Sequence, residues 1–428
     1  ELAGGKVSME IRDEYPTKME GFPVRLNYEY CDRLIGKKLG HDTIKRIAES
    51  LEMKVENEDA EGLNLLVPPY RVDVQRPCDV VEDILRIYGY NNVEIPTELK
   101  SSLTIAEEAD KNYHRENIIG EQLVGAGFSE IMNNSLTKSS YYEETGLNAY
   151  PWEETVKVMN PLSADLGVMR QTLLFGGLES IVRNVNRKAQ NLRFFEVGNV
   201  YKYNKERWTE ENPVKAYSQD YHMALWVTGK RVQGSWAHPD EESSFYELKA
   251  HVENILRRIG VAQGLLVSEK SDNNVFDKAI ALKTRAGKVL VEMGILSHKL
   301  LKRFGLDQKV YYADLDWAGL MKAIRKNKLQ FQEISKYPAV SRDLALLVDN
   351  NVEFAQIEEI ARQADKKLLK RVELFDVYQG KNLPEGKKSY AVNFILQDES
   401  KTLNDKAIDA IMQKLIKNLT NKLGAELR

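Results

Sequence analysis

The sequence predicts a protein of the α+β class with several domains. Its 428 residues exceed the roughly 100 to 200 residues of a typical domain, so we expect about three domains. Runs that alternate apolar and polar residues pair as hairpins, and amphipathic helices are inserted between them. This order favours mainly antiparallel sheets covered by helices over a doubly wound parallel sheet. With 43% hydrophobic and 29% charged residues and a net charge of −3, the composition is that of a soluble globular protein.

A small α+β module is expected over residues 21–98. Residues 1–20 are expected to be a linker from a missing N-terminal part, because the chain lacks an initiator Met and this segment has no apolar signal-peptide core. Gly89 follows the last predicted helix of the module and Pro96 marks a break, as is typical of helix ends. The predicted strands are 24–30, 63–68 and 70–74, and the predicted helices are 41–53 and 79–88.

The central region, residues 104–330, is expected to form one larger domain. A helix is predicted to begin near Met169, because apolar residues from Leu174 to Ala189 recur at spacings of three and four. The segments 279–285 and 288–296 read as a hairpin. Further predicted strands are 129–137, 155–160, 192–203 and 222–229, and further predicted helices are 105–127 and 245–260.

The last region, residues 335–428, has the order βαββαβ, which is the order of a ferredoxin-like fold. It carries 16 Lys and Arg against 14 Asp and Glu, a net charge of +2, which leaves −5 for residues 1–334. The sign of this asymmetry suits a part of the chain that contacts RNA. The predicted strands are 342–349, 370–380, 387–397 and 425–428, and the predicted helices are 354–369 and 405–424.

Four carboxylates lie within eleven positions of the stretch "PPYRVDVQRPCDVVEDILRIYGYNN". They are Asp73, Asp79, Glu82 and Asp83. In one interpretation Asp79 is the N-cap of a helix and Glu82 reaches back to it, which requires no ligand. In the other, the acids gather around a divalent cation, because two unit charges about 5 Å apart repel by roughly 3 kcal/mol at an effective dielectric constant near 20. The second interpretation places Asp73 at the end of the strand that leads into the helix.

Basic residues in the last region are candidate phosphate contacts. Lysines near the end of its first helix are also what the helix dipole favours, so the two interpretations stay open. The candidates are Arg342, Lys366, Lys367, Lys370, Arg371, Lys387 and Lys388.

Several function classes are not supported by the sequence. The segment "LFGGLES" lacks both the GxGxxG and the GxxxxGK[ST] patterns, so a bend or close helix packing is the preferred interpretation of its glycines. Cys31 and Cys78 form no CxxC motif, no apolar run approaches the roughly 18 residues that span a bilayer, and no nucleophile motif of a hydrolase is present. Arg193 and Glu196 on one strand could orient a nucleotide, but a cross-strand ion pair is preferred.

The stretch "PPYRVDVQRPCDVVEDILRIYGYNNVEIP" resembles the B5 domain of the bacterial phenylalanyl-tRNA synthetase beta subunit family. The segments "MNPLSADLGVMRQTLL" and "RFFEVGNVY" resemble that family's class II synthetase-like core, and "YPAVSRDLALLVD", "LFDVYQG" and "KTLND" resemble its ferredoxin-like anticodon-binding domain. These motifs occur in the family's order and cover residues from about 20 to 428. Nothing in the chain resembles the family's N-terminal domains, including its editing domain.

The resemblance implies a function and a set of site residues. It implies that Asp73, Asp79, Glu82 and Asp83 bind Mg²⁺ in a site shared with the alpha subunit, although the family usually has Glu where this chain has Asp83. It implies an α2β2 ligase of the cytoplasm that uses ATP to attach phenylalanine to tRNA(Phe), with the active site in the alpha subunit. The spacing of Arg193 to Glu196 departs from the Arg-x-Glu of a working class II motif, so no residue of this chain is assigned a catalytic role.

Two other functions compete with this interpretation. The chain would be a stand-alone RNA- or DNA-binding protein if its first module and its last domain bound nucleic acid without a ligase partner. It would be a scaffold if it bound only protein.

Overall fold

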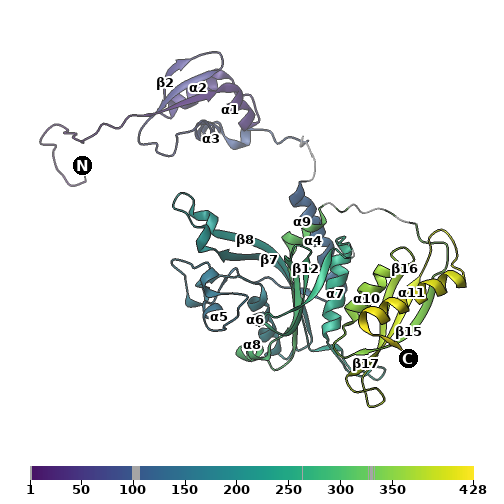
Figure 1. Cartoon of the computed structure of the whole chain (residues 1–428). Coiled ribbons are helices and arrows are strands. Elements are labelled where there is room, and N and C mark those ends of the chain that lie inside the picture. The colour runs from purple at the N-terminus through teal and green to yellow at the C-terminus, as the bar shows by residue number, and fades with distance from the viewer. Residues whose placement is uncertain (1, 99–106, 263, 326, 328–330, 332) are drawn as a thin grey trace. The chain divides into compact units, whose positions relative to one another are not determined.

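The computed structural model describes residues 2–98, 107–262, 264–325, 327, 331 and 333–428. The chain divides into two compact units, Glu1–Ile105 and Ala106–Arg428. Both combine helices with largely antiparallel sheets, which confirms the predicted α+β class (Figure 1). None of the described helices is long and apolar enough to cross a membrane.

The first unit is a three-stranded antiparallel sheet packed against three helices. The strand order is β1-β3-β2, and Leu26 and Leu65 of the sheet pack with Ile44 and Ile84 of the helices in a fully buried core. The elements are β1 (Phe22–Asn27), α1 (Tyr28–Ile35), α2 (His41–Ser50), β2 (Lys54–Glu58), β3 (Gly62–Val67) and α3 (Pro77–Tyr88).

The structure corrects two predicted strands of this unit. The strand predicted over 24–30 ends at Asn27, because the Asn27 side chain accepts a hydrogen bond from the Tyr30 N–H at 2.9 Å and caps helix α1. The strand predicted over 70–74 is a loop of turns with Val72 exposed and Val74 buried. Asp73 therefore lies in this loop and does not end a strand.

A seven-stranded sheet forms the centre of the second unit. Its order is β11-β12-β13-β14-β8-β7-β4, and neighbouring strands are antiparallel except for the parallel pair β4 and β7. The strands of this sheet are β4 (Ser129–Glu130), β7 (Leu192–Tyr203), β8 (Tyr217–Thr228), β11 (Leu266–Ser271), β12 (Phe276–Thr284), β13 (Val289–Leu296) and β14 (Val310–Asp316). The predicted hairpin joins β12 and β13.

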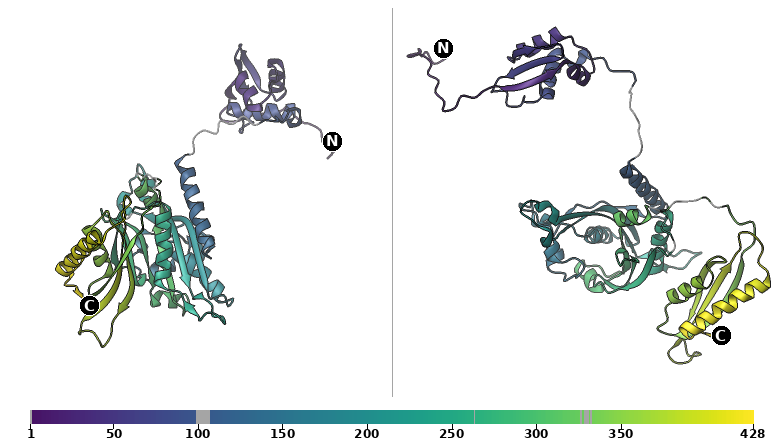
Figure 2. Two further views of the ribbon diagram at one scale, coloured as in Figure 1. Left: turned by 90° about the vertical axis from the view of Figure 1, so that its right-hand side faces the viewer. Right: turned by 45° about the horizontal axis from the view of Figure 1, so that its top comes forward.

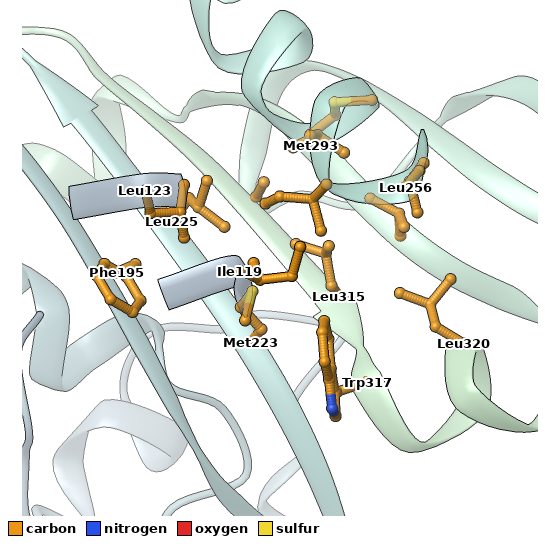
Figure 3. Close-up of a cluster of buried hydrophobic side chains, with 14 of the residues drawn as sticks. Ile119, Leu123, Phe195, Met223, Leu225, Leu256, Met293, Leu315, Trp317 and Leu320 are labelled. Carbon is orange, nitrogen blue, oxygen red and sulfur yellow. The ribbon is translucent and has the colours of Figure 1, made fainter. Parts of the chain in front are cut away.

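One face of this sheet packs against helices α4 (Glu108–Gly125), α7 (Phe245–Arg258) and α9 (Trp317–Ile324). Phe195 of β7 is paired with Leu225 of β8, and residues paired across neighbouring strands point to the same face. Both side chains therefore meet the apolar side of α4. Figure 3 shows Ile119 and Leu123 of α4 beside these two side chains. This apolar contact anchors α4 to the sheet.

The opposite face packs against α6 (Leu174–Val185) and α8 (His298–Arg303). A Cβ atom at Gly177 of α6 would lie 2.1 Å from Cε2 of the buried Trp226, which confirms that glycines of "LFGGLES" serve close helix packing. The predicted helix near Met169 begins at Leu174. Segment 155–160, predicted as a strand, forms only an isolated bridge between Lys157 and Val168.

Smaller elements complete the central region. Two two-stranded sheets pair β5 with β6 and β9 with β10. The elements are β5 (Leu136–Thr137), α5 (Ser140–Glu143), β6 (Val168–Met169), β9 (Lys230–Val232) and β10 (Glu241–Glu242).

The last part of the chain has the predicted ferredoxin-like fold. Its sheet has the order β16-β17-β15-β18, with α10 and α11 packed on one face (Figure 2). The elements are β15 (Val340–Asp349), α10 (Phe354–Ala364), β16 (Leu369–Tyr378), β17 (Lys387–Leu396), α11 (Asp405–Leu423) and β18 (Glu426–Leu427). Every element predicted for this region is present, with its ends shifted by a few residues.

Candidate functional site

The four predicted acids lie on the loop before α3 and on its first two turns. Asp73 and Glu82 are exposed, whereas the carboxylates of Asp79 and Asp83 are only 13% and 10% exposed. The helix begins at Pro77, whose fixed φ and missing N–H suit the first helical position. Arg76 is therefore the N-cap residue, and the prediction that Asp79 is the N-cap with Glu82 reaching back is wrong by three positions.

Asp79 occupies the third position of the helix and binds the backbone that precedes it. Its Oδ2 atom accepts hydrogen bonds from the N–H groups of Arg76 at 2.8 Å and Gln75 at 3.2 Å. The Arg76 guanidinium donates to Oδ1 at 2.8 Å, and this contact, with the backbone hydrogen bonds, holds the pKa of Asp79 well below its usual range. Asp79 thus has a structural role at the helix start, where the helix dipole favours a negative charge.

Asp83 is the buried acid of the group, and both of its oxygens contact arginines. Arg71, from the loop, donates to Oδ2, and Arg86, one turn further along the helix, donates to Oδ1 at 3.0 Å. The Nε atom of Arg71 also lies 3.7 Å from Oδ1 of Asp73. Arg71 therefore lies between two of the predicted metal ligands.

These arginines decide how well the acids fit a metal ion. Among the residues that the structure describes, no three Asp, Glu, His or Cys side chains form a group that could hold a metal ion. Mg²⁺ requires oxygen atoms at about 2.1 Å in octahedral geometry, but guanidinium groups already neutralise Asp79 and Asp83. In this arrangement the acids do not fit Mg²⁺. The sequence contained the signal for this, since Arg71, Arg76 and Arg86 are interspersed with the acids.

The basic candidates of the last domain fall into two groups at opposite ends of its sheet. The register pairs Arg342 with Phe394 and Arg371 with Ile395, and Lys366, Lys367 and Lys370 lie at or just before the start of β16. Lys387 and Lys388 begin β17, eight residues before Ile395 or roughly 27 Å away along a strand. The seven residues therefore do not form one patch.

Lys388 already has partners within the domain. Its side chain is buried, its ammonium group donates to the Asn350 carbonyl at 2.9 Å, and it lies 4.9 Å from the centre of the Tyr390 ring. The prediction that Lys388 contacts nucleic acid stays a prediction, and these contacts give the side chain a structural role in the chain by itself. Lys366 and Lys367 are exposed and have no ion pair among the described residues, whereas Lys370 pairs with Glu399 at 2.7 Å.

Arg193 and Glu196 do not pair with each other. Residues three apart on a strand point to opposite faces, so Arg193 binds Glu247 of α7 at 2.9 Å while Glu196 binds Arg170 at 2.7 Å on the other face. Arg170 and Glu196 are 8% and 1% exposed, and the Asn133 N–H and side-chain amide donate to the same carboxylate. Both ion pairs are structural, and Arg170 was not predicted from the sequence.

A second charged pair on that face joins β8 to β14. The His222 ring nitrogen Nδ1 lies 2.8 Å from Asp314 Oδ1. Burial lowers the pKa of His222, but the carboxylates of Asp314, Asp316 and Asp220 raise it by more, so the net shift is upward. We therefore expect this contact within the central sheet to weaken as the pH rises.

Three protein-family models match the chain. They are the tRNA synthetase B5 domain over residues 24–90, the phenylalanyl tRNA synthetase beta chain CLM domain over 95–317 and the ferredoxin-fold anticodon binding domain over 335–428. These folds and matches define the class of the protein: it is assembled from domains of aminoacyl-tRNA synthetases. The chain belongs to the phenylalanyl-tRNA synthetase beta chain family, whose core model covers more than half of its residues.

Curated relatives agree with this family. Phenylalanine–tRNA ligase beta subunits from Bacteroides thetaiotaomicron and Porphyromonas gingivalis are 59% and 47% identical over 100% of this chain. The chain spans about half the length of these relatives, 52% of each. A pyrrolysyl tRNA synthetase structure from Desulfitobacterium hafniense aligns at 15% identity over 50% of this chain and 67% of that one, and its TM-score of 0.37 is too low to support an argument.

Proposed function

We propose that the chain is the C-terminal portion of a phenylalanine–tRNA ligase beta subunit, which holds tRNA(Phe) and pairs with a catalytic alpha subunit for the ATP-dependent attachment of phenylalanine. The observation that carries this proposal is the 59% identity to such a subunit across the whole chain. The proposed domains are a linker over 1–20, a B5 domain over 21–98, a core over 104–330 and an anticodon-binding domain over 335–428.

The ferredoxin-like domain is the proposed tRNA contact. Lys366 and Lys367 are exposed at one end of its sheet, and Phe375 and Tyr378 of β16 expose aromatic rings. Phosphates bind such cations, and unpaired bases stack on such rings. Arg342, Lys370, Arg371 and Lys387 are proposed as weaker contacts, because each lies near a carboxylate that competes with the phosphate.

The proposal is tested by titrating tRNA(Phe) binding with salt, using this chain with a co-expressed alpha subunit. The double variant Lys366→Gln/Lys367→Gln should reduce the slope of log affinity against log salt by roughly one unit for each lost phosphate contact. The matched control is Lys302→Gln/Arg303→Gln, which removes two exposed cations from α8 in the central region.

Three results would contradict the proposal. They are an unchanged slope in the lysine variant, failure of the chain to co-purify with the alpha subunit, and equal binding of unrelated RNA. The last two together would favour a stand-alone nucleic-acid-binding protein, and binding of protein alone would favour a scaffold.

The remaining parts of the proposal concern the assembled ligase. We infer a cytoplasmic location and an α2β2 assembly by analogy with the family. Magnesium binding by Asp73, Asp79, Glu82 and Asp83 stays a prediction for the complex with the alpha subunit, because in the chain by itself arginines lie against three of these four carboxylates.

A further inference from the structure

The segment before the first strand alternates apolar and polar residues. Residues 6–12 read "KVSMEIR", in which Val7, Met9 and Ile11 are separated by single polar residues. Alternation with a period of two is the pattern of a half-buried β-strand, and seven residues are a usual strand length. On a strand the three apolar side chains would lie on one face. The opposite face would carry Lys6, Ser8, Glu10 and Arg12.

The structure gives this segment neither a partner strand nor a core. Residues 2–21 form no helix or strand, and Figure 1 draws them as an irregular trace before β1. Val7, Met9 and Ile11 are 92%, 69% and 97% exposed, and none of them belongs to the core of the first unit. No hydrogen bond joins the backbone of residues 6–12 to another described residue. A single strand leaves its apolar face and its backbone groups in water, so it needs a sheet to be stable.

The sheet of the first unit is poorly suited to accept this strand. Its two open edges are β1 and β2. Strand β1 contains Pro23, which has no N–H to donate to a further strand. Strand β2 has a register shift between Val55 and Asn57 and presents charged side chains, and natural proteins block sheet edges with such features. The charged residues are Lys54, Glu56 and Glu58. The accepting sheet therefore lies outside the first unit.

We propose that residues 6–12 form a strand of a sheet in the part of the subunit that this chain does not span. The inference rests on the proposed function, in which the chain is the C-terminal portion of a longer beta subunit. The relatives support this partner, since the chain spans only 52% of their length. The accepting sheet offers an open edge and, on one face, an apolar core that covers the three apolar side chains. The linker proposed over residues 1–20 then shortens to residues 13–20.

The experiment measures backbone hydrogen exchange of residues 6–12 by mass spectrometry in two proteins, the 428-residue chain and the full-length subunit. In the 428-residue chain these amides should exchange as fast as those of an unfolded peptide, because no backbone hydrogen bond protects them. In the full-length subunit they should exchange at least about a hundredfold more slowly. Residues 13–18 should exchange fast in both proteins and are the internal control.

Two matched variants of the full-length subunit test the apolar face of the strand. Met9→Asn places an amide on that face and should speed the exchange of residues 6–12 by at least about tenfold. Ser8→Asn introduces the same residue on the polar face and should change the exchange by less than about threefold. Equal effects of the two substitutions would contradict an amphipathic strand. The comparison of the two unmodified proteins decides the proposal even if Met9→Asn does not fold.

Three results would overturn the proposal. One is fast exchange of residues 6–12 in the full-length subunit. Another is slow exchange in the 428-residue chain at every protein concentration, because the segment would then pair with a sheet of this chain. The third is exchange in that chain that slows as a dimer forms in sedimentation, which would assign the open edge to a second copy. None of these measurements uses tRNA or the alpha subunit, so a failure to bind either one would contradict the proposed function alone.

Discussion

Two arginine–carboxylate networks of this protein look alike in composition and differ in surroundings. In the central sheet, Glu196 is 1% exposed and is bound by Arg170 and by the backbone and side chain of Asn133. In the first unit, Asp83 is bound by two arginines, of which Arg86 is 54% exposed. The first network is enclosed by regular structure, and the second is held partly by a loop.

The difference teaches that two ion pairs of similar burial can differ in how the backbone holds the arginine. The Arg170 guanidinium also donates to the carbonyls of Asn199 at 2.9 Å and Asn133 at 3.1 Å, so its position is set by the backbone. In the described structure the Arg71 guanidinium donates to no backbone carbonyl, and its partners are the two carboxylates.

The largest expected effect comes from Arg170→Met in the enclosed network. The change leaves Glu196 buried without a cation, which typically costs about 3–5 kcal/mol of folding free energy. All five tryptophans of the chain lie between Trp152 and Trp317, so urea unfolding followed by tryptophan fluorescence reports on the central region. Lys202→Met, which breaks an exposed pair with Glu154, is the control and should cost about 0–1 kcal/mol. If Arg170→Met lowered the free energy of unfolding no more than Lys202→Met does, the enclosed network would not be the more important of the two.

An intermediate effect is expected from Asp83→Asn. The amide keeps the shape of the side chain but loses the charge that holds Arg71, and such losses are about 1–3 kcal/mol. The measurement is hydrogen exchange of residues 77–88, because the first unit contains no tryptophan. Glu82→Gln, at an exposed neighbouring position, should leave the exchange unchanged. Equal protection in Asp83→Asn and the unmodified chain would show that the arginine contacts do not hold α3.

A smaller, pH-dependent effect is expected from His222→Gln. Because the folded state raises the pKa of His222, its pair with Asp314 contributes stability that is fully present below the ordinary value of 6.5 and is lost as the pH rises through the folded value. The variant should be less stable than the unmodified chain by about 1 kcal/mol at acidic pH and equal to it at high pH. The measurement is the midpoint of urea unfolding at a series of pH values. The control is His238→Gln, because His238 is exposed. If the stability difference between His222→Gln and the unmodified chain grew as the pH rises, the raised pKa of His222 would be contradicted.

The smallest effect is expected from Arg76→Met, because Arg76 is 74% exposed. Asp79 keeps its hydrogen bonds from two backbone N–H groups, so exchange of α3 amides at neutral pH should not change measurably. Since the pKa of Asp79 is lowered, its contribution is present above the ordinary value of 3.8 and is lost only as the pH falls below it. If Arg76→Met accelerated exchange as much as Asp83→Asn, burial would not be what separates the contacts.

Local sequence patterns were sufficient to predict the elements in which apolar residues recur at a regular strand or helix spacing. The predicted strand 342–349 and helix 405–424 match β15 and α11 within a few residues, because alternation and helical spacing depend on near neighbours. The strand predicted over 70–74 failed although Val72 and Val74 alternate with polar residues, since the segment makes consecutive turns before Pro77. Alternation would place Val72 and Val74 on one face, but the turns leave Val72 exposed and bury Val74.

The sequence by itself determined the fold class, the family resemblance and the position of four acids around the start of one helix. The tertiary structure alone decided that Asp83 is the buried acid, that Arg71 reaches it across twelve residues, and that Glu196 pairs with Arg170 and not with Arg193. Spacing along a strand or helix fixes the face on which a residue lies, as it does for Arg193 and Glu196. The partner on that face comes from a distant part of the chain, and only the packing of loops and strands against each other brings the two charges together.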